Sequence, residues 1–422
     1  MVVEKVMTAY LRRVYSRILS LDSFDDLTPP RPEEGAKYLL YVHIPFCEEL
    51  CPYCSFNRFP FERELALQYL KGVEKEVSLY ADLGFDFASL YVGGGTPTVL
   101  PAEMAELLHT LRSRFRIGQI SLETNPNHLT DDIVATLKDA GVNRLSVGVQ
   151  SFDDSLLQQM ERLHKYGSGE EIRERLLKYA GTFDTLNVDM IFNFPTQNRS
   201  MLEKDLRIIR DMQADQVTFY PLMVSELTRK ELAARFGPIS YSQEKEFFGL
   251  IQDMLGDTYS NGTAWCFSRK NSMIDEYIVD YDEYIGVGSG SFGYVGGAVL
   301  ANTFSVSDYL NAVNHGRLPL QGKRTFSRAD RIRYDFTMKL FGESLKVDEA
   351  EEKFQGVFKR TLWKELTLLR LIGAYSEEKG VLRLTKSGRY LWVVMMREFF
   401  TGVNNFRDIC RSRIGGDEKR RQ

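Results

Sequence analysis

The sequence predicts an α/β fold: a partial (β/α)6-type barrel followed by an α-rich, winged-helix-like C-terminal domain. Between residue 37 and about residue 300, short β-branched or apolar runs alternate with longer amphipathic runs. Strands separated by helices of this length form βαβ units and a parallel sheet. Six such units suit a partial or full barrel, and in such folds the functional side chains lie at the carboxyl ends of the strands.

The individual elements follow from this alternation. Short β-branched or apolar runs predict strands, and the amphipathic runs between them predict helices. The strands are predicted at residues 37–43, 89–93, 119–123, 144–148, 185–191 and 216–222. The helices are predicted at residues 62–83, 102–115, 131–140, 155–160, 170–179 and 201–212.

After about residue 305 the alternation stops, which predicts a different kind of domain. Residues 327–345 are predicted as one helix and residues 354–373 as amphipathic helices. A short β-wing at 375–385 and a helix at 386–400 follow. Helix, helix, wing and helix is a winged-helix-like order.

The chain therefore divides into three predicted segments: a helical lead-in at 1–36, the barrel at 37–305 and a C-terminal cap at 306–422. Within the cap, residues 360–371 occupy the place of a DNA-recognition helix but mix acidic and apolar side chains. Because fold alone does not fix function, a structural or substrate-covering cap is expected rather than a DNA-binding domain.

Composition excludes several classes of protein. A net charge of −4 in 422 residues gives no sign of a nucleic-acid surface, which usually has a basic balance. No stretch approaches the apolar length of a membrane span, and the N-terminus has no apolar signal core with a cleavage site. With only five cysteines, three of them close together, a reducing compartment is favoured. We expect a cytoplasmic protein with no membrane span and no nucleic-acid partner.

The cysteine group is the most informative feature. Cys47, Cys51 and Cys54 follow the apolar run 41–46 with the spacing C-x3-C-x2-C. Three thiolates on one loop can hold three irons of a [4Fe–4S] cluster and leave the fourth iron open to an exogenous ligand. A zinc site normally takes two pairs of ligands, and no second pair follows at zinc-knuckle distance. The remaining alternative is a chance grouping of cysteines on a strand-to-loop turn.

Two further patterns lie at the predicted carboxyl ends of strands. Residues 93–98 read Gly-Gly-Gly-Thr-Pro-Thr, and consecutive glycines let the backbone approach a charged ligand closely. Tight turns also need glycine, so this pattern alone is a weak signal. Glu123 ends the third strand, where its carboxylate can bind a ligand or cap the next helix.

The run from Tyr41 to Cys54 resembles the radical S-adenosylmethionine (SAM) superfamily and, more narrowly, the oxygen-independent coproporphyrinogen III oxidase family. The resemblance implies that Cys47, Cys51 and Cys54 ligate a [4Fe–4S] cluster, whose open iron is chelated by the amino and carboxylate groups of SAM. It also implies cleavage of SAM to a 5′-deoxyadenosyl radical after one-electron reduction by a flavodoxin- or ferredoxin-type donor. The hard chemistry belongs to the cofactor, which the protein orients and shields.

The same resemblance assigns residues to the SAM site, and it assigns no catalytic residue. Gly94, Gly95 and Thr96 belong to the segment that binds the methionine moiety, and Arg162 pairs with the methionine carboxylate. Glu123 accepts hydrogen bonds from the methionine amino group or from ribose hydroxyls. The other implied SAM contacts are Gln150 and Asp189 to ribose, Ile191 to adenine, Tyr41 and Tyr53 beside the sulfonium, and Phe56 after the third cysteine. Plain core packing is the alternative for either tyrosine.

The chain departs from the oxidases of this family in two places. They have a further cysteine where this chain has Phe56, and a longer segment before the cluster. The segment 390–400 is more similar to a haem-degrading radical methyltransferase branch, whose relatives use two SAM molecules. The motif Cys54-x-Phe56-Asn57 is more similar to a haem-chaperone branch. We expect a tetrapyrrole substrate, haem or porphyrin, and radical methyl transfer coupled to haem opening. Oxidative decarboxylation of coproporphyrinogen III and non-catalytic haem chaperoning are the alternatives.

Two weaker candidates complete the set. The glycine-rich segment 286–293 is expected to close the barrel near the substrate or a second SAM. Cys266 is predicted near the rim of the active site, where a buried structural role is favoured over the alternative of carrying a radical or a methyl group.

Overall fold

The computed structural model describes residues 27–269, 279, 281–412 and 414–415. Most of the predicted lead-in lies outside these residues, and its described part, 27–36, contains no helix. Among the described residues, no helix is both long enough and apolar enough to cross a lipid bilayer.

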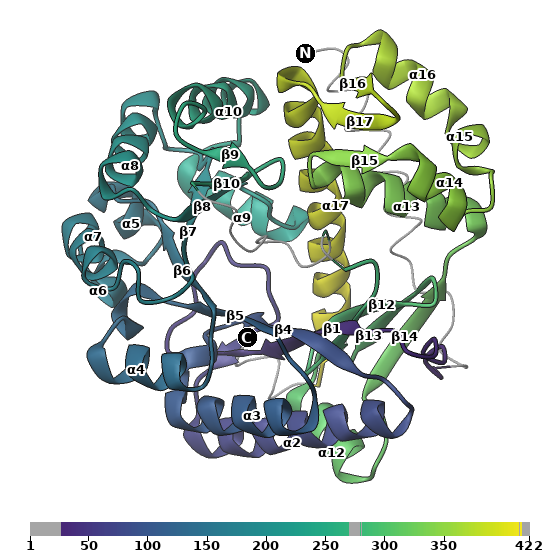
Figure 1. Cartoon of the computed structure of the whole chain (residues 1–422). Coiled ribbons are helices and arrows are strands. Elements are labelled where there is room, and N and C mark those ends of the chain that lie inside the picture. Colours follow the sequence, from purple (N-terminus) through teal and green to yellow (C-terminus); the bar gives the residue numbers. More distant parts are fainter. Residues whose placement is uncertain (1–26, 270–278, 280, 413, 416–422) are drawn as a thin grey trace.

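The six predicted strands are confirmed as the parallel centre of one large sheet. They are β1 (Tyr38–Ile44), β4 (Phe87–Gly94), β5 (Gln119–Thr124), β6 (Arg144–Gln150), β7 (Thr185–Phe192) and β8 (Gln216–Pro221). Each pairs in parallel with the next, in the order of the sequence, so all six carboxyl ends lie along one edge of the curved sheet. This arrangement is the predicted partial barrel (Figure 1).

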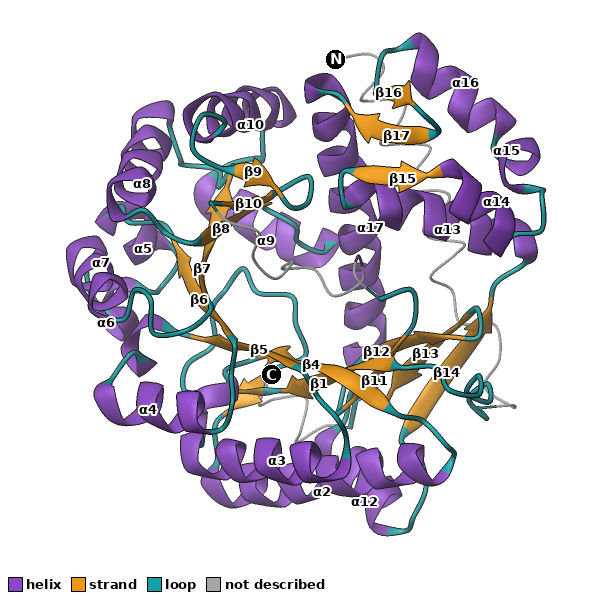
Figure 2. Cartoon of the chain, in the orientation of Figure 1, coloured by secondary structure: helices purple, strands orange, loops and turns teal. Residues whose placement is uncertain are grey.

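The helices of the βαβ units cover the outer face of this sheet (Figure 2). They are α2 (Arg63–Asp82), α3 (Pro101–Arg114), α4 (Asp131–Asp139), α5 (Asp154–Gln159), α7 (Gly169–Lys178) and α8 (Arg199–Met212). Side-chain hydrogen bonds cap the N-termini of several of these helices. Ser168, for example, forms a complete capping box with Glu171 at the start of α7. Their apolar faces pack on strands that are buried nearly throughout, which is typical of a sheet covered on its faces.

The sheet continues beyond the six strands at both edges, which the sequence analysis did not predict. Beside β1 lie β11 (Tyr284–Val287), β12 (Phe292–Val295), β13 (Ala298–Asn302) and β14 (Leu320–Thr325). Beside β8 lie β10 (Cys266–Ser268) and β9 (Ser260–Asn261). These strands are short, and most pair antiparallel, so they lack the long helical crossovers that made the central strands visible. The sheet thus extends past residue 305, and the division into domains stays a prediction.

The C-terminal part contains the predicted wing, with corrections. The helix predicted at 327–345 is α13 (Arg328–Phe341), and it is shorter because Glu343 has a positive φ of 73°, which ends helical geometry. Residues Ser344–Lys346 instead form β15, which pairs with the wing strand β17 (Val381–Leu384), itself paired with β16 (Tyr375–Glu378). The amphipathic helices predicted at 354–373 are α15 (Phe358–Thr361) and α16 (Trp363–Leu371), and α14 (Val347–Lys353) precedes them.

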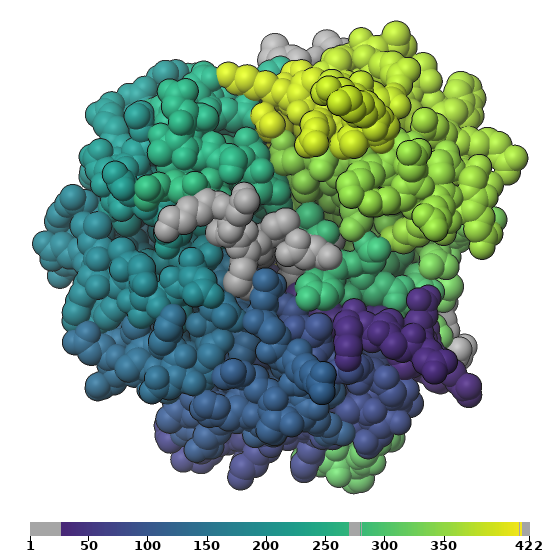
Figure 3. Space-filling model, in the orientation of Figure 1, coloured from purple at the N-terminus to yellow at the C-terminus, as the bar shows by residue number. Residues whose placement is uncertain are grey.

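The last helix, α17 (Lys386–Ser412), is longer than the predicted 386–400 and connects the wing to the barrel. Near its start, the Trp392 indole donates to the Thr337 carbonyl at 3.0 Å. Further along, the buried Arg397 guanidinium pairs with Glu398 and with Glu244 of α10 (Tyr241–Leu255). The surfaces of the wing region and α10 therefore adjoin in the space-filling view (Figure 3). The remaining helices are α6 (Leu163–Tyr166), α9 (Glu226–Phe236) and α12 (Val306–Asn314).

Candidate active site

A cavity of about 370 Å³ lies at the carboxyl ends of the parallel strands, between the sheet and α17. All fourteen residues that the sequence analysis assigned to the cluster or to SAM line it, although their roles stay predictions. They are Tyr41, Cys47, Cys51, Tyr53, Cys54, Phe56, Gly94, Gly95, Thr96, Glu123, Gln150, Arg162, Asp189 and Ile191.

Backbone contacts hold the cysteine loop against the end of β4. The amides of Gly95 and Thr96 donate to the carbonyls of Ile44 and Phe46, each at 2.7 Å. A Cβ atom at Gly95 would lie 2.6 Å from the Phe46 carbonyl oxygen, closer than real Cβ contacts come. The glycine run therefore allows the backbone of the cysteine loop to pack closely against β4, a role that the sequence analysis did not predict. The short parallel pair β2 (Phe46–Cys47) and β3 (Phe59–Pro60) closes the loop.

A chain of buried polar groups anchors the loop on its other side. The Asn57 side-chain amide donates to the carbonyls of Ser289 and Phe304, at 3.2 and 3.1 Å. The main-chain carbonyl oxygen of Asn57 can only accept a hydrogen bond, so the His43 Nε2, 2.8 Å away, carries the proton. The Tyr41 hydroxyl then donates to the His43 Nδ1 at 2.9 Å. Burial lowers the pKa of His43 to about 4, which keeps this ring neutral and the Tyr41 hydroxyl oriented.

Arg162 lies beside the cysteines. One guanidinium nitrogen lies 3.5 Å from the Cys51 sulfur and 3.4 Å from the Tyr53 hydroxyl, and the other donates to Asn125 at 3.3 Å and to the Gly148 carbonyl. The guanidinium also stacks on the Tyr166 ring, 4.2 Å from its centre. A fully charged arginine in this position can pair with a thiolate or with the carboxylate of a bound ligand.

The two predicted acids face the cavity from β5 and β7, on either side of β6, and are held by hydrogen bonds. Glu123 accepts from the Tyr91 hydroxyl at 2.8 Å and from the Gly94 amide at 3.1 Å. Asp189 accepts from Ser146 at 2.6 Å and from Asn187 at 2.7 Å. Between them, Gln150 has a positive φ of 76° at a bulge in β6, a conformation that costs a non-glycine residue free energy and is common at functional sites.

The residues present fit a [4Fe–4S] cluster bound by three cysteines. All three thiols open on the same cavity, and a cation and a glycine-lined backbone adjoin them. In the described part of the chain, no three His, Cys, Asp or Glu side chains surround a position for a single metal ion. Four buried polar atoms near the loop, on Ser55, Arg58 and Arg162, also have no hydrogen-bond partner.

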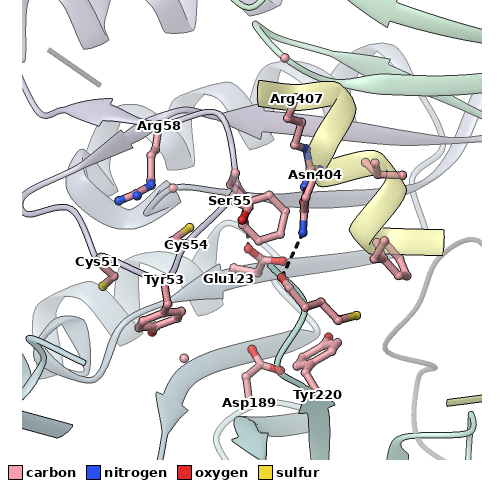
Figure 4. Close-up of a pocket in the computed structure, with 18 of the residues that line it drawn as sticks. Cys51, Tyr53, Cys54, Ser55, Arg58, Glu123, Asp189, Tyr220, Asn404 and Arg407 are labelled. Atoms are coloured by element: carbon pink, nitrogen blue, oxygen red, sulfur yellow. Dashed lines mark hydrogen bonds between the residues drawn. The ribbon is translucent and has the colours of Figure 1, made fainter. Parts of the chain in front are cut away.

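The wall opposite the cysteines comes from the C-terminal half of the chain, and the sequence analysis missed most of it. Figure 4 shows Asn404 and Arg407 extending from α17 into the cavity. Asn404 donates to the Met223 carbonyl at 3.0 Å, and the Arg407 guanidinium lies 4.6 Å from the centre of the Phe56 ring. The other aromatic side chains from this half of the chain that line the cavity are Tyr220, Tyr284, Phe292, Tyr294, Phe326, Tyr334, Phe399, Phe400 and Phe406. The amphipathic continuation of the last helix past Phe400 was the signal that could have revealed this wall.

The structure corrects the predicted position of Cys266 and shows why residues 286–293 are rich in glycine. Cys266 does not line the cavity; it is fully buried in the core, so it has the structural role. In the segment 286–293, the close approaches that require glycine are to protein atoms: a Cβ at Gly288 would lie 2.5 Å from the His43 carbonyl, and one at Gly290 would lie 2.6 Å from the Asn57 Cβ. The glycines of this segment therefore serve packing, although Gly290 itself reaches the cavity.

Comparisons with known proteins agree with this geometry. Residues 41–209 match the Radical SAM superfamily. The heme chaperone HemW of Bacillus subtilis is 27% identical over 83% of this chain and 94% of its own length. An oxygen-independent coproporphyrinogen III oxidase of Helicobacter pylori is 26% identical over 89% of this chain and 87% of its own length. The anaerobilin synthase of Escherichia coli O157:H7 is 27% identical over 67% of each chain.

The solved structure of coproporphyrinogen III oxidase (HemN) from Escherichia coli has the same fold. It superimposes with a TM-score of 0.73 over 86% of this chain and 90% of its own, at 24% sequence identity. A radical SAM domain implies a [4Fe–4S] cluster and SAM as cofactors. The chain therefore has a radical SAM domain within a HemN-like fold, and its relatives include proteins named as heme chaperones and as coproporphyrinogen oxidases.

Proposed function

We propose that this chain is a radical SAM enzyme that acts on a haem-like tetrapyrrole. The observation that carries the proposal is the two-sided cavity: the cysteine loop and the predicted SAM residues form one side, and aromatic rings form the other. A flat conjugated ligand fits between aromatic faces, and the names of the relatives point to the same class of compound.

When bound, the cluster and SAM supply a radical that abstracts hydrogen or adds to a substrate. The protein's part is to bind and orient. Arg162, Glu123 and Asp189 are positioned to hold the charged and hydroxylated parts of SAM, and the neutral His43 keeps the Tyr41 hydroxyl turned in one direction. The aromatic wall from α17 excludes water from the space beside them.

The charges of the cavity favour a substrate with few carboxylates. Among the described residues that line it, the basic side chains are Arg58, Arg162 and Arg407, and Arg162 contacts Cys51. Coproporphyrinogen has four propionates and haem has two. A cavity with so few cations left for substrate carboxylates suits haem better.

The reaction that we propose is radical methyl transfer coupled to opening of haem. Phe56 stands where the oxidases have a further cysteine, and its ring packs under Arg407 of α17. The relative named anaerobilin synthase also supports a haem-directed reaction. The relatives named as oxidases or chaperones match over more of their length, so decarboxylation and haem chaperoning are outcomes that the experiment must separate.

The test is an anaerobic incubation of the reconstituted protein with dithionite, SAM and either haem or coproporphyrinogen III, followed by chromatography and mass spectrometry. Methyl transfer yields both 5′-deoxyadenosine and S-adenosylhomocysteine, and the tetrapyrrole gains the mass of a methyl group. Loss of carbon dioxide from coproporphyrinogen, without S-adenosylhomocysteine, would replace this proposal with decarboxylation. Stable haem binding without any modified tetrapyrrole would replace it with chaperoning.

A further inference from the structure

Arg58, four residues after Cys54, is a half-buried cation on the cysteine loop. It lines the cavity, and its Nε and one terminal nitrogen, Nη1, are buried without a hydrogen-bond partner within the described ranges of the chain. Figure 4 shows this side chain on the same side as Cys51 and Cys54, away from Asn404 and Tyr220. Buried donors of a charged group are normally paired, so a partner for these two nitrogens is expected when the site is loaded.

The carboxylates of the cavity are engaged elsewhere. Glu123 accepts from Tyr91 and Gly94, and Asp189 accepts from Ser146 and Asn187. The third acid of the cavity wall, Glu49, pairs with His164 at 3.0 Å and with Lys165 at 3.7 Å. None of these contacts involves Arg58, so a different anion has to balance its charge.

The cysteines, as thiolate ligands of a bound cluster, are the remaining anionic groups on this side of the cavity. Three cysteine thiolates together with a [4Fe–4S] core carry net negative charge, and reduction adds one more electron to it. A nearby cation stabilises the reduced form more than the oxidised form.

We propose that Arg58 is a positioning residue for the cluster. Its positive charge offsets the negative charge of the cysteine-bound cluster and so raises the reduction potential of the cluster. The inference rests on the proposed function only through the presence of the cluster. It concerns a one-electron reduction in which no bond forms or breaks, and dithionite supplies the electron. Charge and hydrogen bonding near the sulfurs are established means of setting such potentials.

The experiment is a redox titration of the reconstituted protein, followed by electron paramagnetic resonance, without SAM or tetrapyrrole. Wild type is compared with R58Q, R58K and R407Q. Arg407 is the matched control, because it is a second arginine of the same cavity that extends from α17 at the opposite wall. In R58Q, the ratio of reduced to oxidised cluster at a fixed applied potential should fall about tenfold, which equals about 59 mV for a one-electron couple. R58K should retain most of the wild-type potential, and R407Q should match wild type.

Iron and sulfide contents separate the possible failures. A wild-type protein that holds no cluster contradicts the proposed function itself. An R58Q protein with full iron content and an unchanged potential overturns the role of Arg58. Loss of the cluster from R58Q but not from R58K supports the role of the charge, whereas equal loss from both overturns it.

Discussion

The two walls of the cavity are built in different ways. The cysteine wall is fixed by backbone: the amides of Gly95 and Thr96 bond to the loop, and Asn57 ties it to segments more than two hundred residues away. The wall from α17 is made of side chains on one helix, and of its polar groups Asn404 bonds to a single main-chain carbonyl. Backbone contacts tolerate little change because they require particular residues such as glycine, whereas side chains on a helix can be exchanged one at a time. Under the proposed function, this difference predicts a rigid wall for the cofactors and an adaptable wall for the substrate.

The largest effect on the cofactor wall is expected from the loss of a cluster ligand. Replacing Cys47, Cys51 or Cys54 by alanine should abolish the broad visible absorbance of the reconstituted protein, because a cluster held by two thiolates is labile. Cys266→Ala and Cys410→Ala are the controls and should keep the absorbance, since both residues are buried in apolar packing. Iron near four per chain in the triple alanine variant would contradict the assignment.

The next largest effect is expected from a substitution that disturbs the backbone contact at Gly95 and leaves the three cysteine ligands in place. Gly95→Ala places a Cβ against the Phe46 carbonyl, so the cysteine loop must move; we expect a loss of about 1–3 kcal/mol in stability and incomplete cluster loading. Thermal unfolding and iron content measure both effects. Gly118→Ala is the matched control, because the nearest atom to its Cβ would be 4.0 Å away. Equal iron content in the two variants would show that the backbone contact is not essential.

SAM binding tests the charged groups of the same wall. Asp189→Ala and Arg162→Ala should keep the cluster but weaken SAM binding, since a charge-assisted hydrogen bond contributes about 1.5–3 kcal/mol, roughly ten- to hundredfold in affinity. Anaerobic calorimetry measures the affinity. Asp253→Ala, which removes an exposed acid of α10, is a control that should bind like wild type. Unchanged affinity in both site variants would remove these residues from the SAM site.

The smallest effect is expected at the wall from α17. Asn404→Ala and Arg407→Gln should each weaken haem binding about fivefold, because each removes one polar group that faces the substrate space, and one hydrogen bond contributes about 1 kcal/mol. SAM affinity should stay at the wild-type value in both. Haem titration followed by absorbance and SAM calorimetry on the same samples measure the two affinities. A parallel loss of both would show that the two walls are not independent.

Sequence reasoning succeeded where a local pattern carried the structure. The cysteine spacing, the glycine run and the polar residues at strand ends are short motifs at the carboxyl ends of parallel strands, and βαβ topology brings those ends together. It failed at β11, β14 and α17, where pairing and packing link segments without a fixed spacing, and it overlooked the Gly296-Gly297 turn that joins β12 to β13 as a hairpin. Arg407 meets Phe56, for example, only because α17 crosses from the wing to the barrel. The function of the glycines at 288 and 290 was missed for the same reason, since their partners Asn57 and His43 lie far away in the chain.

Six of the residues that line the proposed substrate space lie on one helix, and this has an evolutionary consequence. Phe399, Phe400, Val403, Asn404, Phe406 and Arg407 all lie within three turns of α17. A few substitutions in that short stretch would reshape the space for a substrate while leaving the reductive machinery on the opposite wall untouched. Under the proposed function, a lineage with this architecture can change its substrate through a few substitutions in one helix. Relatives with different named activities are expected from such a history.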